Sequence, residues 1–290
     1  MGNDQYLVSI AMPVVNVERT ILSAIRSLLK QTYREWECLV IDDGSSDNTI
    51  GVLRSISDTR VRILSDGTHK GLAARLNEAI ALSRGNYFAR MDGDDIAYPC
   101  RLERQIDYLT THPEVNLLGT YALVFGVGGR ILGKRGENIS RPWRYRLMMK
   151  TVPIVHPTFV GKMEWFRTHA YQEWSDYFQD QQLLVSNLDQ IQFAVLPEIL
   201  LGYREEQLSI VKQTRYRWSH IRSFPFLRQQ SGLVIAIFAT LIQFIKLAVD
   251  ILAISTGLDY RLLKSRAMPV SPEDLSLWRQ VWDSVNVENE

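Results

Sequence analysis

The sequence contains only two cysteines in 290 residues, Cys38 inside an apolar run and Cys100 directly after a proline. Neither their number nor their spacing matches a disulfide framework or a zinc site, because both need larger sets of ligating residues. The shortage of cysteine therefore argues against a disulfide-stapled domain and indicates a reducing, cytoplasmic setting.

An excess of charge is also missing, since 33 Lys and Arg residues stand against 32 Asp and Glu residues. A nucleic-acid-binding protein usually shows a clear basic excess, so no nucleic acid is expected as a partner. The N-terminal "MGNDQYLVSIAMPVV" has no positively charged segment ahead of its apolar run. It therefore predicts a first strand and not a signal peptide.

Glycine is missing from "MPVVNVERT", the segment at the end of the first expected strand. A dinucleotide-binding oxidoreductase needs the pattern GxGxxG at this place, so that class is excluded. A sugar nucleotidyltransferase also needs a glycine-rich, basic loop here, and it stays open only as an alternative.

Short apolar runs alternate with helical patterns in the first hundred residues. The expected strands are "YLVSIAMPVV", "WECLVIDD", "RVRILSD" and "NYFARMDGDD", separated by helical patterns at 20–30, 49–57 and 71–83. This βαβαβαβ order predicts an α/β fold, a mostly parallel sheet with helices on both faces. Ligands of such sheets gather at the carboxyl ends of the strands, where "MPVVN", "IDDGSSD" and "MDGDD" all fall.

Two adjacent carboxylates, Asp42 and Asp43, end the second expected strand. The residues after them are ordinary turn formers, and Asp47 is expected to cap the next helix. Adjacent carboxylates repel each other and suit hydrogen-bond donors on a ligand, such as the N–H of a base or the hydroxyls of a ribose. We therefore predict that Asp42 and Asp43 bind a ligand.

Three carboxylates follow the fourth expected strand in "MDGDD". Asp92 and Asp94 are separated by one small residue, so both can face a hard cation with oxygen ligands, Mn²⁺ or Mg²⁺. Asp95 is the candidate cap of a helix expected at 101–109. This D-x-D at a strand end predicts a metal site.

Residues 8–210 resemble the family-2 glycosyltransferases of the GT-A fold, especially the bacterial surface-polysaccharide branch. The motifs that carry the resemblance are "SIAMPVVN", "LLKQTYREWECLVIDDGSSDNT", "HKGLAARLNEAIALSRGNYFARMDGDD", "YPCRLERQIDYLTTHPEVNLLGT", "HPTFV" and "LPEILLGYR". The resemblance implies inverting transfer from a nucleotide-diphosphate sugar, with a UDP-sugar as first choice, to a glycan or polyprenyl-linked acceptor. We expect a catalytic domain at 1–211, with a nucleotide-sugar half at 1–115 and an acceptor half at 116–211.

The resemblance also implies roles for individual residues. Asp94 holds the cation that stabilises the leaving diphosphate, and Asp92 contributes to this site through the ribose or a water molecule. Asp180 in "YFQDQQLLVSN" matches the family's central aspartate and is the expected general base. Gln179 and Gln182 replace its two acidic neighbours, so a weak or inactive nucleotide-sugar-binding scaffold stays open. The implied nucleotide-sugar-binding residues are Pro13, Asn16, Asp42, Asp43, Lys70, Gly71, Asp92 and Arg204.

Two of these assignments have plain structural alternatives. Lys70 and Gly71 stand at an expected helix N-terminus, where backbone N–H groups favour phosphate, but Lys70 is equally well explained as a solvated turn residue. The guanidinium of Arg204 would neutralise a diphosphate, and its alternative is a pair with Glu205 or Glu206.

Three further residues fall in the expected acceptor half. His156 in "VHPTF" is a candidate metal ligand near the acceptor and the phosphates, or else a structural histidine. Trp165 and Trp174 suit either stacking on a sugar or packing in the core.

The last part of the chain, 212–290, changes character. Residues 215–230 are basic and aromatic, and 232–249 are apolar apart from Gln243 and Lys246. A membrane-spanning helix needs about 20 apolar residues, so this run is slightly short.

A polar stripe at helical spacing interrupts this apolar run, formed by Thr240, Gln243, Lys246 and Asp250. The stripe favours a helix lying in a membrane interface beside anionic headgroups, while packing on the catalytic domain or on a second subunit is the alternative. The sequence therefore predicts a helical, membrane-associating extension that holds the protein at the inner face of the cytoplasmic membrane.

Overall fold

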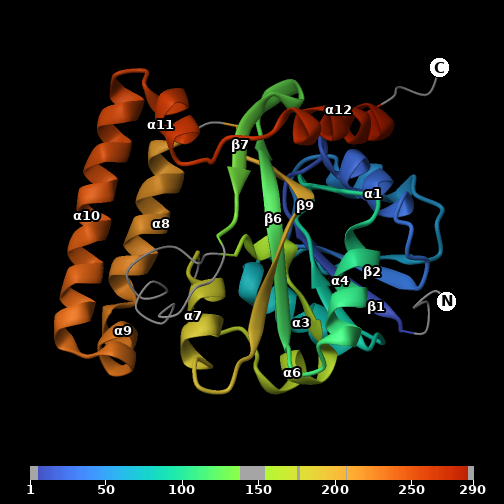
Figure 1. Cartoon of the computed structure of the whole chain (residues 1–290), viewed down its shortest axis with the longest axis horizontal. Coiled ribbons are helices and arrows are strands. Elements are labelled where there is room, and N and C mark those ends of the chain that lie inside the picture. Colours follow the sequence, from blue (N-terminus) through green and yellow to red (C-terminus); the bar gives the residue numbers. More distant parts are fainter. Residues whose placement is uncertain (1–5, 138–153, 175–176, 207, 287–290) are drawn as a thin grey trace.

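The computed structural model describes residues 6–137, 154–174, 177–206 and 208–286. The strands are β1 Val8–Val14, β2 Trp36–Asp42, β3 Val61–Ser65, β4 Tyr87–Arg90, β5 Ile96–Ala97, β6 Leu117–Phe125, β7 Ile131–Arg135, β8 Val160–Lys162 and β9 Phe193–Arg204. They form one sheet in the order β3-β2-β1-β4-β8-β6-β9-β5, and β7 pairs with β6 (Figure 1).

Helices cover both faces of this sheet and extend beyond one side of it (Figure 1). The described α-helices are α1 Ile21–Leu29, α2 Thr49–Arg54, α3 Leu72–Leu82, α4 Arg101–Thr111, α6 Met163–Thr168, α7 Gln179–Ser186, α8 Ile210–Arg222, α9 Phe224–Ser231, α10 Leu233–Ser255, α11 Asp259–Ser265 and α12 Pro272–Asn286.

The first four strands confirm the predicted parallel arrangement. β1 pairs in parallel with β2 on one side and with β4 on the other, and β2 pairs in parallel with β3. Because β1 lies between β2 and β4, the polar segments that follow these three strands meet at one edge of the sheet. The later strands make the sheet mixed, since β8 is antiparallel to both β4 and β6.

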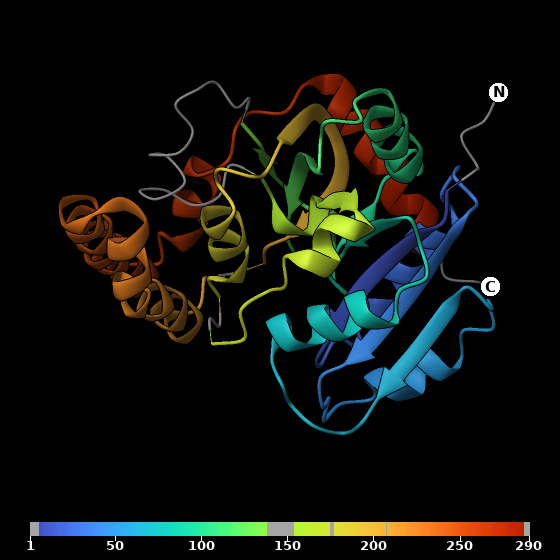
Figure 2. The same ribbon diagram turned by 90° about the horizontal axis from the view of Figure 1, so that it is seen from below.

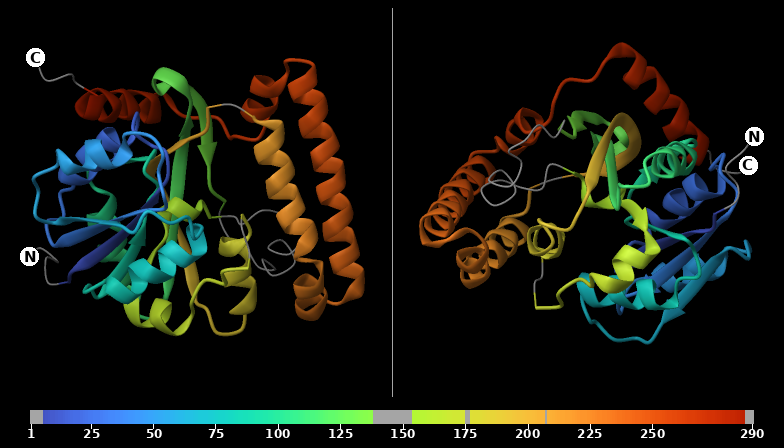
Figure 3. Two further views of the ribbon diagram at one scale, coloured as in Figure 1. Left: turned by 180° about the vertical axis from the view of Figure 1, so that it is seen from behind. Right: turned by 60° about the horizontal axis from the view of Figure 1, so that its bottom comes forward.

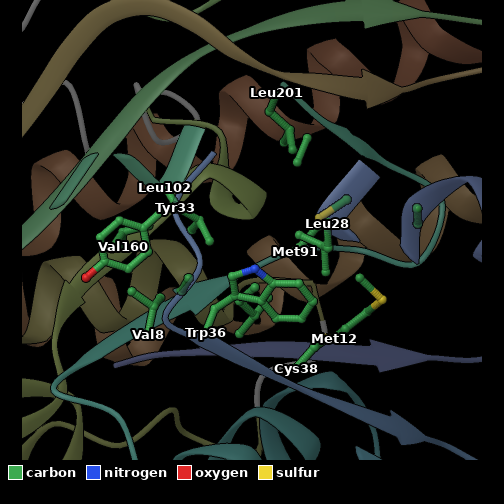
Figure 4. Packing of buried hydrophobic residues seen from close by; sticks show 14 of the residues in the cluster. Val8, Met12, Leu28, Tyr33, Trp36, Cys38, Met91, Leu102, Val160 and Leu201 are labelled. Carbon is green, nitrogen blue, oxygen red and sulfur yellow. The ribbon is translucent and has the colours of Figure 1, made fainter. Parts of the chain in front are cut away.

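The alternation of side chains along the buried strands fills two separate cores. Val8, Ile10 and Met12 of β1 belong to the core beneath α1 and α4, whereas Ala11 belongs to the core beneath α3 and α6. Figure 4 shows the first of these cores, in which Met12 and Trp36 pack beside Leu28. Burying each such side chain stabilises the fold by about 1.5–3 kcal/mol.

The C-terminal helix α12 returns to the body of the protein formed by the sheet and its covering helices. Trp278 is buried against Tyr98 and Phe125, and its indole N–H donates to the carbonyl oxygen of Gly129 at 2.9 Å. The hydroxyl of Ser23 on α1 donates to Asn286 at 2.8 Å. The expected extension 212–290 therefore contains a segment that packs as part of the body.

Helices α8, α9 and α10 form a hairpin that stands at one side of the sheet (Figures 2 and 3). Asp250 of α10 is fully buried and pairs with Arg217 of α8 at 3.1 Å and with Arg266 after α11. Arg217 also donates to the side-chain oxygen of Gln243 at 3.1 Å. The predicted polar stripe is therefore real, but Gln243 and Asp250 face α8, where a charge network satisfies them, instead of facing water.

The opposite face of α10 is apolar and exposed. Ile245 and Leu252, for example, keep 64% and 65% of their surface accessible. The helix is 23 residues long, and its length and composition suffice for crossing a membrane. The exposed apolar residues of α10 are Leu233, Val234, Ile237, Phe238, Leu241, Phe244, Ile245, Val249, Ile251 and Leu252.

We expect Asp250→Asn to lower the free energy of unfolding by about 3–5 kcal/mol, because the guanidinium of Arg217 would stay buried without its charge partner. Equilibrium denaturation followed by circular dichroism measures the change. Asp283→Asn, on the exposed side of α12, is the matched control. A loss no larger than in the control would show that the network does not hold the hairpin.

Candidate active site

The edge of the sheet beyond β1 and β2 is tied together by polar loops. Asn16 follows β1 with a positive φ of 53°, and its side-chain oxygen accepts the N–H of Ser46 at 2.8 Å. Asp42 ends β2, and its carboxylate accepts the N–H of Ser45 at 3.2 Å and the hydroxyl of Ser65 at 3.0 Å. Asn16 and Asp42, which we predicted to bind a ligand, therefore also hold the loops of this edge in place through hydrogen bonds.

Pro13 lies within the first strand, as the expected run "YLVSIAMPVV" placed it, and its role in nucleotide-sugar binding stays a prediction. It is buried inside β1, in register with Ile41 of β2, and does not belong to the turn that follows the strand. Val15 and Asn16 are the exposed residues of that turn. The turn begins later because Pro13 and Val14 still continue the parallel pairing with β2.

The N-terminus of α3 is occupied by Asp43. The backbone N–H groups of Lys70 and Gly71 donate to its carboxylate at 2.7 and 3.0 Å, and Arg75 donates to it from α3 at 2.9 Å. The ammonium of Lys70 pairs with Asp66 at 2.6 Å. These are the N–H groups that we expected to bind phosphate, and an internal carboxylate satisfies them instead, as a helix cap does.

The carboxylates of Asp92, Asp94 and Asp95 come together after β4. One oxygen from each lies within 4.8 Å of the others. Asp95 is fully buried and accepts the backbone N–H of Arg204 at 2.9 Å. The prediction that Asp95 caps the next helix is wrong: α4 begins at Arg101, as expected, but its N-cap position is Cys100, and β5 and a turn separate it from Asp95.

Burial and mutual repulsion perturb these carboxylates. Burial, followed by the charge of Asp92, raises the pKa of Asp94 to about 6. Burial and the neighbouring Asp94 raise the pKa of Asp95 well above its usual range. Carboxylates held so close together require either protons or a cation, and their hard oxygen atoms fit Mn²⁺ or Mg²⁺.

Arg204 lies against this acidic cluster from β9. Its Nε donates to the carbonyl oxygen of Asp94 at 2.8 Å, and its Nη1 pairs with Glu206 at 3.1 Å. The guanidinium also lies 4.7 Å from the centre of the Phe125 ring. The alternative pairing with Glu206 is therefore present, and Arg204 additionally holds the acidic loop in place.

Asp180 stands in the first turn of α7. That helix lies beside the sheet (Figure 2). Burial raises the pKa of its carboxyl above the ordinary value, while the charge of Arg90 opposes that shift. Its neighbours Gln179 and Gln182 are buried, and among the described residues each has a side-chain oxygen without a hydrogen-bond partner. A carboxyl with a raised pKa is suited to accept a proton near neutral pH.

His156 lies close to this region but outside the acidic cluster. Its Nε2 is 3.0 Å from the hydroxyl of Tyr171, and burial, together with the charge of Arg90, lowers its pKa well below the usual range. The metal-ligand group found among the described residues does not include it. The contacts of His156 thus correspond to its structural alternative, a histidine bonded inside the fold.

The two tryptophans of the acceptor half differ in burial. Trp165 is buried beside Phe166 and stacks on His169, as expected of core packing. Trp174 keeps 53% of its surface exposed.

Sequence reasoning missed two buried arginines. Arg75 pairs with Asp43, and Arg90, the last residue of β4, pairs with Asp92 at 2.5 Å. The available signal for Arg90 was a charged residue within an otherwise apolar strand, directly ahead of the D-x-D.

We expect Asp94→Asn to abolish thermal stabilisation of the protein by Mn²⁺, because a ligand raises stability only as far as it binds the folded state. In the unchanged protein the stabilisation should weaken as the pH falls below 6, since protons compete for a carboxyl whose pKa is about 6. Thermal-shift titrations with Mn²⁺ measure both effects. Glu114→Gln, at an exposed position, is the control, and an unchanged response of Asp94→Asn would refute the site.

Comparison with known proteins adds independent findings. The model of glycosyl transferase family 2 matches residues 9–174. EpsE of Bacillus subtilis (strain 168), named as a glycosyltransferase, is 36% identical over 168 residues, which cover 56% of this chain and 58% of EpsE. The Escherichia coli protein WfgD, named UDP-Glc:alpha-D-GlcNAc-diphosphoundecaprenol beta-1,3-glucosyltransferase, is 42% identical over 121 residues, 42% of this chain and 48% of WfgD. The chain thus spans about half the length of these relatives.

Solved structures show the same fold. TarS 1-349 from S. aureus, in complex with UDP-GlcNAc, aligns with a TM-score of 0.58 at 15% identity and covers 96% of this chain and 81% of its own. The mannosyltransferase PcManGT from Pyrobaculum calidifontis, in complex with GDP-Man and Mn2+, also gives a TM-score of 0.58 at 15% identity, over 98% and 87%. These likenesses confirm the predicted GT-A fold. Since the family model matches more than half of its residues, the chain belongs to glycosyl transferase family 2.

Proposed function

We propose that this protein is an inverting, metal-dependent glycosyltransferase of bacterial surface-polysaccharide synthesis. It would move a sugar from a nucleotide-diphosphate donor to a glycan acceptor on a polyprenyl carrier. The observation that carries the proposal is the acidic cluster of Asp92, Asp94 and Asp95 at the end of β4, in the same molecule as an aspartate of raised pKa, Asp180. Family membership and the printed activity of WfgD support it.

The donor in this proposal is a UDP-sugar. WfgD is named for UDP-Glc, and the TarS structure contains UDP-GlcNAc. PcManGT contains GDP-Man, so the fold accepts more than one base. Asn16, Asp42 and Asp43 remain our candidates for the base and ribose, on the edge beyond β1 and β2.

The proposed reaction is one in-line displacement. The acceptor hydroxyl loses its proton to Asp180 and its oxygen forms a bond to the anomeric carbon, as the bond from that carbon to the diphosphate breaks on the opposite face. The raised pKa keeps Asp180 a better base than an ordinary aspartate. A divalent cation held by Asp94 and Asp92 would act as a Lewis acid for the leaving diphosphate. Arg204 adds positive charge beside the same carboxylates.

The acceptor side of the proposal requires a membrane. The exposed apolar face of α10 would enter the interface of the cytoplasmic leaflet, and the exposed Lys212, Arg215 and Arg222 of α8 would attract anionic headgroups. Crossing the membrane would carry α8 and its charged residues into the lipid together with α10, because Gln243 and Asp250 of α10 are bound to α8. We therefore place the hairpin on the membrane surface and not across it. In this arrangement the catalytic part is 1–211 together with α12, which packs into its core.

We expect Asp180→Asn to reduce transfer by a factor of about 10² or more while donor binding is preserved, as follows from loss of a general base. The rate of the unchanged enzyme should fall on the acid side at a higher pH than an ordinary aspartate would give, because burial raises the pKa of Asp180. Transfer from a radiolabelled donor measures the rate, with Glu164→Gln as the exposed control. An unchanged protein that binds the donor without transferring or hydrolysing it would be the scaffold alternative.

We expect the full chain to float with vesicles containing anionic lipid, less at high salt but still detectably, since each basic residue adds only about 1 kcal/mol near the surface. The double change Ile245→Asp and Leu252→Asp should abolish flotation. Leu277→Asp, an exposed apolar residue on α12, is the matched control. Truncation after Val211 is a poor test, because it also removes Trp278 from the core. A full chain that stays monodisperse at the bottom of the gradient would contradict membrane association.

A further inference from the structure

Arg90 is held rigidly at the end of β4. Its backbone N–H donates to the carbonyl oxygen of Phe159 at 2.8 Å, and its own carbonyl oxygen accepts a bond from Arg101 at 2.8 Å. Its side chain is only 4% exposed. The strand and its neighbours therefore fix where this guanidinium lies.

The hydrogen-bonding capacity of Arg90 is mostly unused. Its Nη2 pairs with Asp92 at 2.5 Å, whereas its Nε and Nη1 are buried and have no hydrogen-bond partner among the described residues. A guanidinium carries five N–H donors, and a buried charged group with unmade hydrogen bonds is costly to the fold.

Arg101 is a useful comparison, because it is buried to the same degree and adjoins Arg90. Its Nε donates to Gln105 at 3.1 Å, and its Nη2 donates to the carbonyl oxygens of Arg90 and Pro157, both at 2.8 Å. A structural arginine in this fold thus finds internal acceptors. For Nε and Nη1 of Arg90 the described residues supply no acceptor, which points to acceptors supplied by a ligand.

The surroundings of Arg90 indicate which part of a ligand that is. Its guanidinium pairs with Asp92 of the acidic cluster at 2.5 Å, and its charge also acts on Asp95, Asp180, His156 and Tyr171. Arg90 therefore pairs directly with the acidic cluster proposed for the diphosphate side, and its charge also reaches the proposed base. In an in-line displacement, the group between the leaving diphosphate and the base is the transferred sugar.

We propose that the Nε–H and Nη1–H groups of Arg90 donate hydrogen bonds to hydroxyl oxygens of the transferred sugar, so that Arg90 forms part of a sugar subsite and selects donors bearing those hydroxyls. This inference rests on the proposed glycosyl transfer. The Nε–H and Nη1–H groups lie on opposite edges of the planar guanidinium, so they can donate to two separate oxygens, which a lysine ammonium does not reproduce. A buried donor that loses its acceptor discriminates strongly against a sugar lacking that hydroxyl.

The test compares UDP with UDP-glucose and UDP-N-acetylglucosamine, each titrated calorimetrically with Mn²⁺ present. In Arg90→Lys we expect the dissociation constant of the bound UDP-sugar to rise about tenfold or more, while that of UDP changes by less than about twofold. Arg104→Lys, an exposed arginine paired with Glu198, is the matched control and should change neither.

Deoxy analogues of the bound UDP-sugar give a second measurement, which starts from the unchanged protein. The unchanged protein should bind at least one monodeoxy analogue about tenfold more weakly, and in a folded Arg90→Lys that penalty should disappear. Equal weakening of UDP and UDP-sugar, no weakening in the variant, or equal binding of all deoxy analogues would each overturn the sugar subsite. An unchanged protein that binds no nucleotide sugar at all would overturn the proposed function first, and the subsite with it.

Discussion

Repulsion among the three carboxylates that end β4 is the constraint on which the arrangement of the site depends. Asp92, Asp94 and Asp95 lie too close together, and too deeply, to be ionised together without positive charge nearby. The fold supplies part of it through Arg90 and Arg204, which approach from two different strands. The remaining demand for positive charge suits this edge of the sheet to the divalent cation and the anionic donor of the proposed function.

The sequence predicted those features that follow from local pattern. The alternation of apolar runs with helical patterns predicted the parallel strands. The polar residues at the ends of "VIDD" and "RMDGDD" lie at one edge of the sheet because β1 lies between β2 and β4. The family resemblance pointed to Asp180, whose raised pKa depends on burial that no local pattern reveals.

Other features depend on contacts between distant residues and were misjudged. Asp43 caps α3 through Lys70 and Gly71, which follow it by almost thirty residues, so the expected phosphate contacts are already used within the protein. The stripe on α10 was recognised, but its direction depends on Arg217 of α8, a partner that helical spacing alone cannot identify. Likewise, the lack of hydrogen-bond partners for Nε and Nη1 of Arg90 among the described residues becomes visible only in the three-dimensional structure.

The return of α12 to the body has a mechanical consequence for the hairpin. The chain leaves β9 to enter α8, and after α11 it pairs again with the body, where Lys134 and Met268 bridge, before Trp278 enters the core. The hairpin is thus anchored at both ends, and it cannot swing as a free tail would. If its apolar face rests on a bilayer, the tilt and the height of the catalytic edge above the lipid are set by the protein. Under the proposed function, that height would limit how many sugars a membrane-bound acceptor carries when its terminal hydroxyl reaches the proposed base, Asp180.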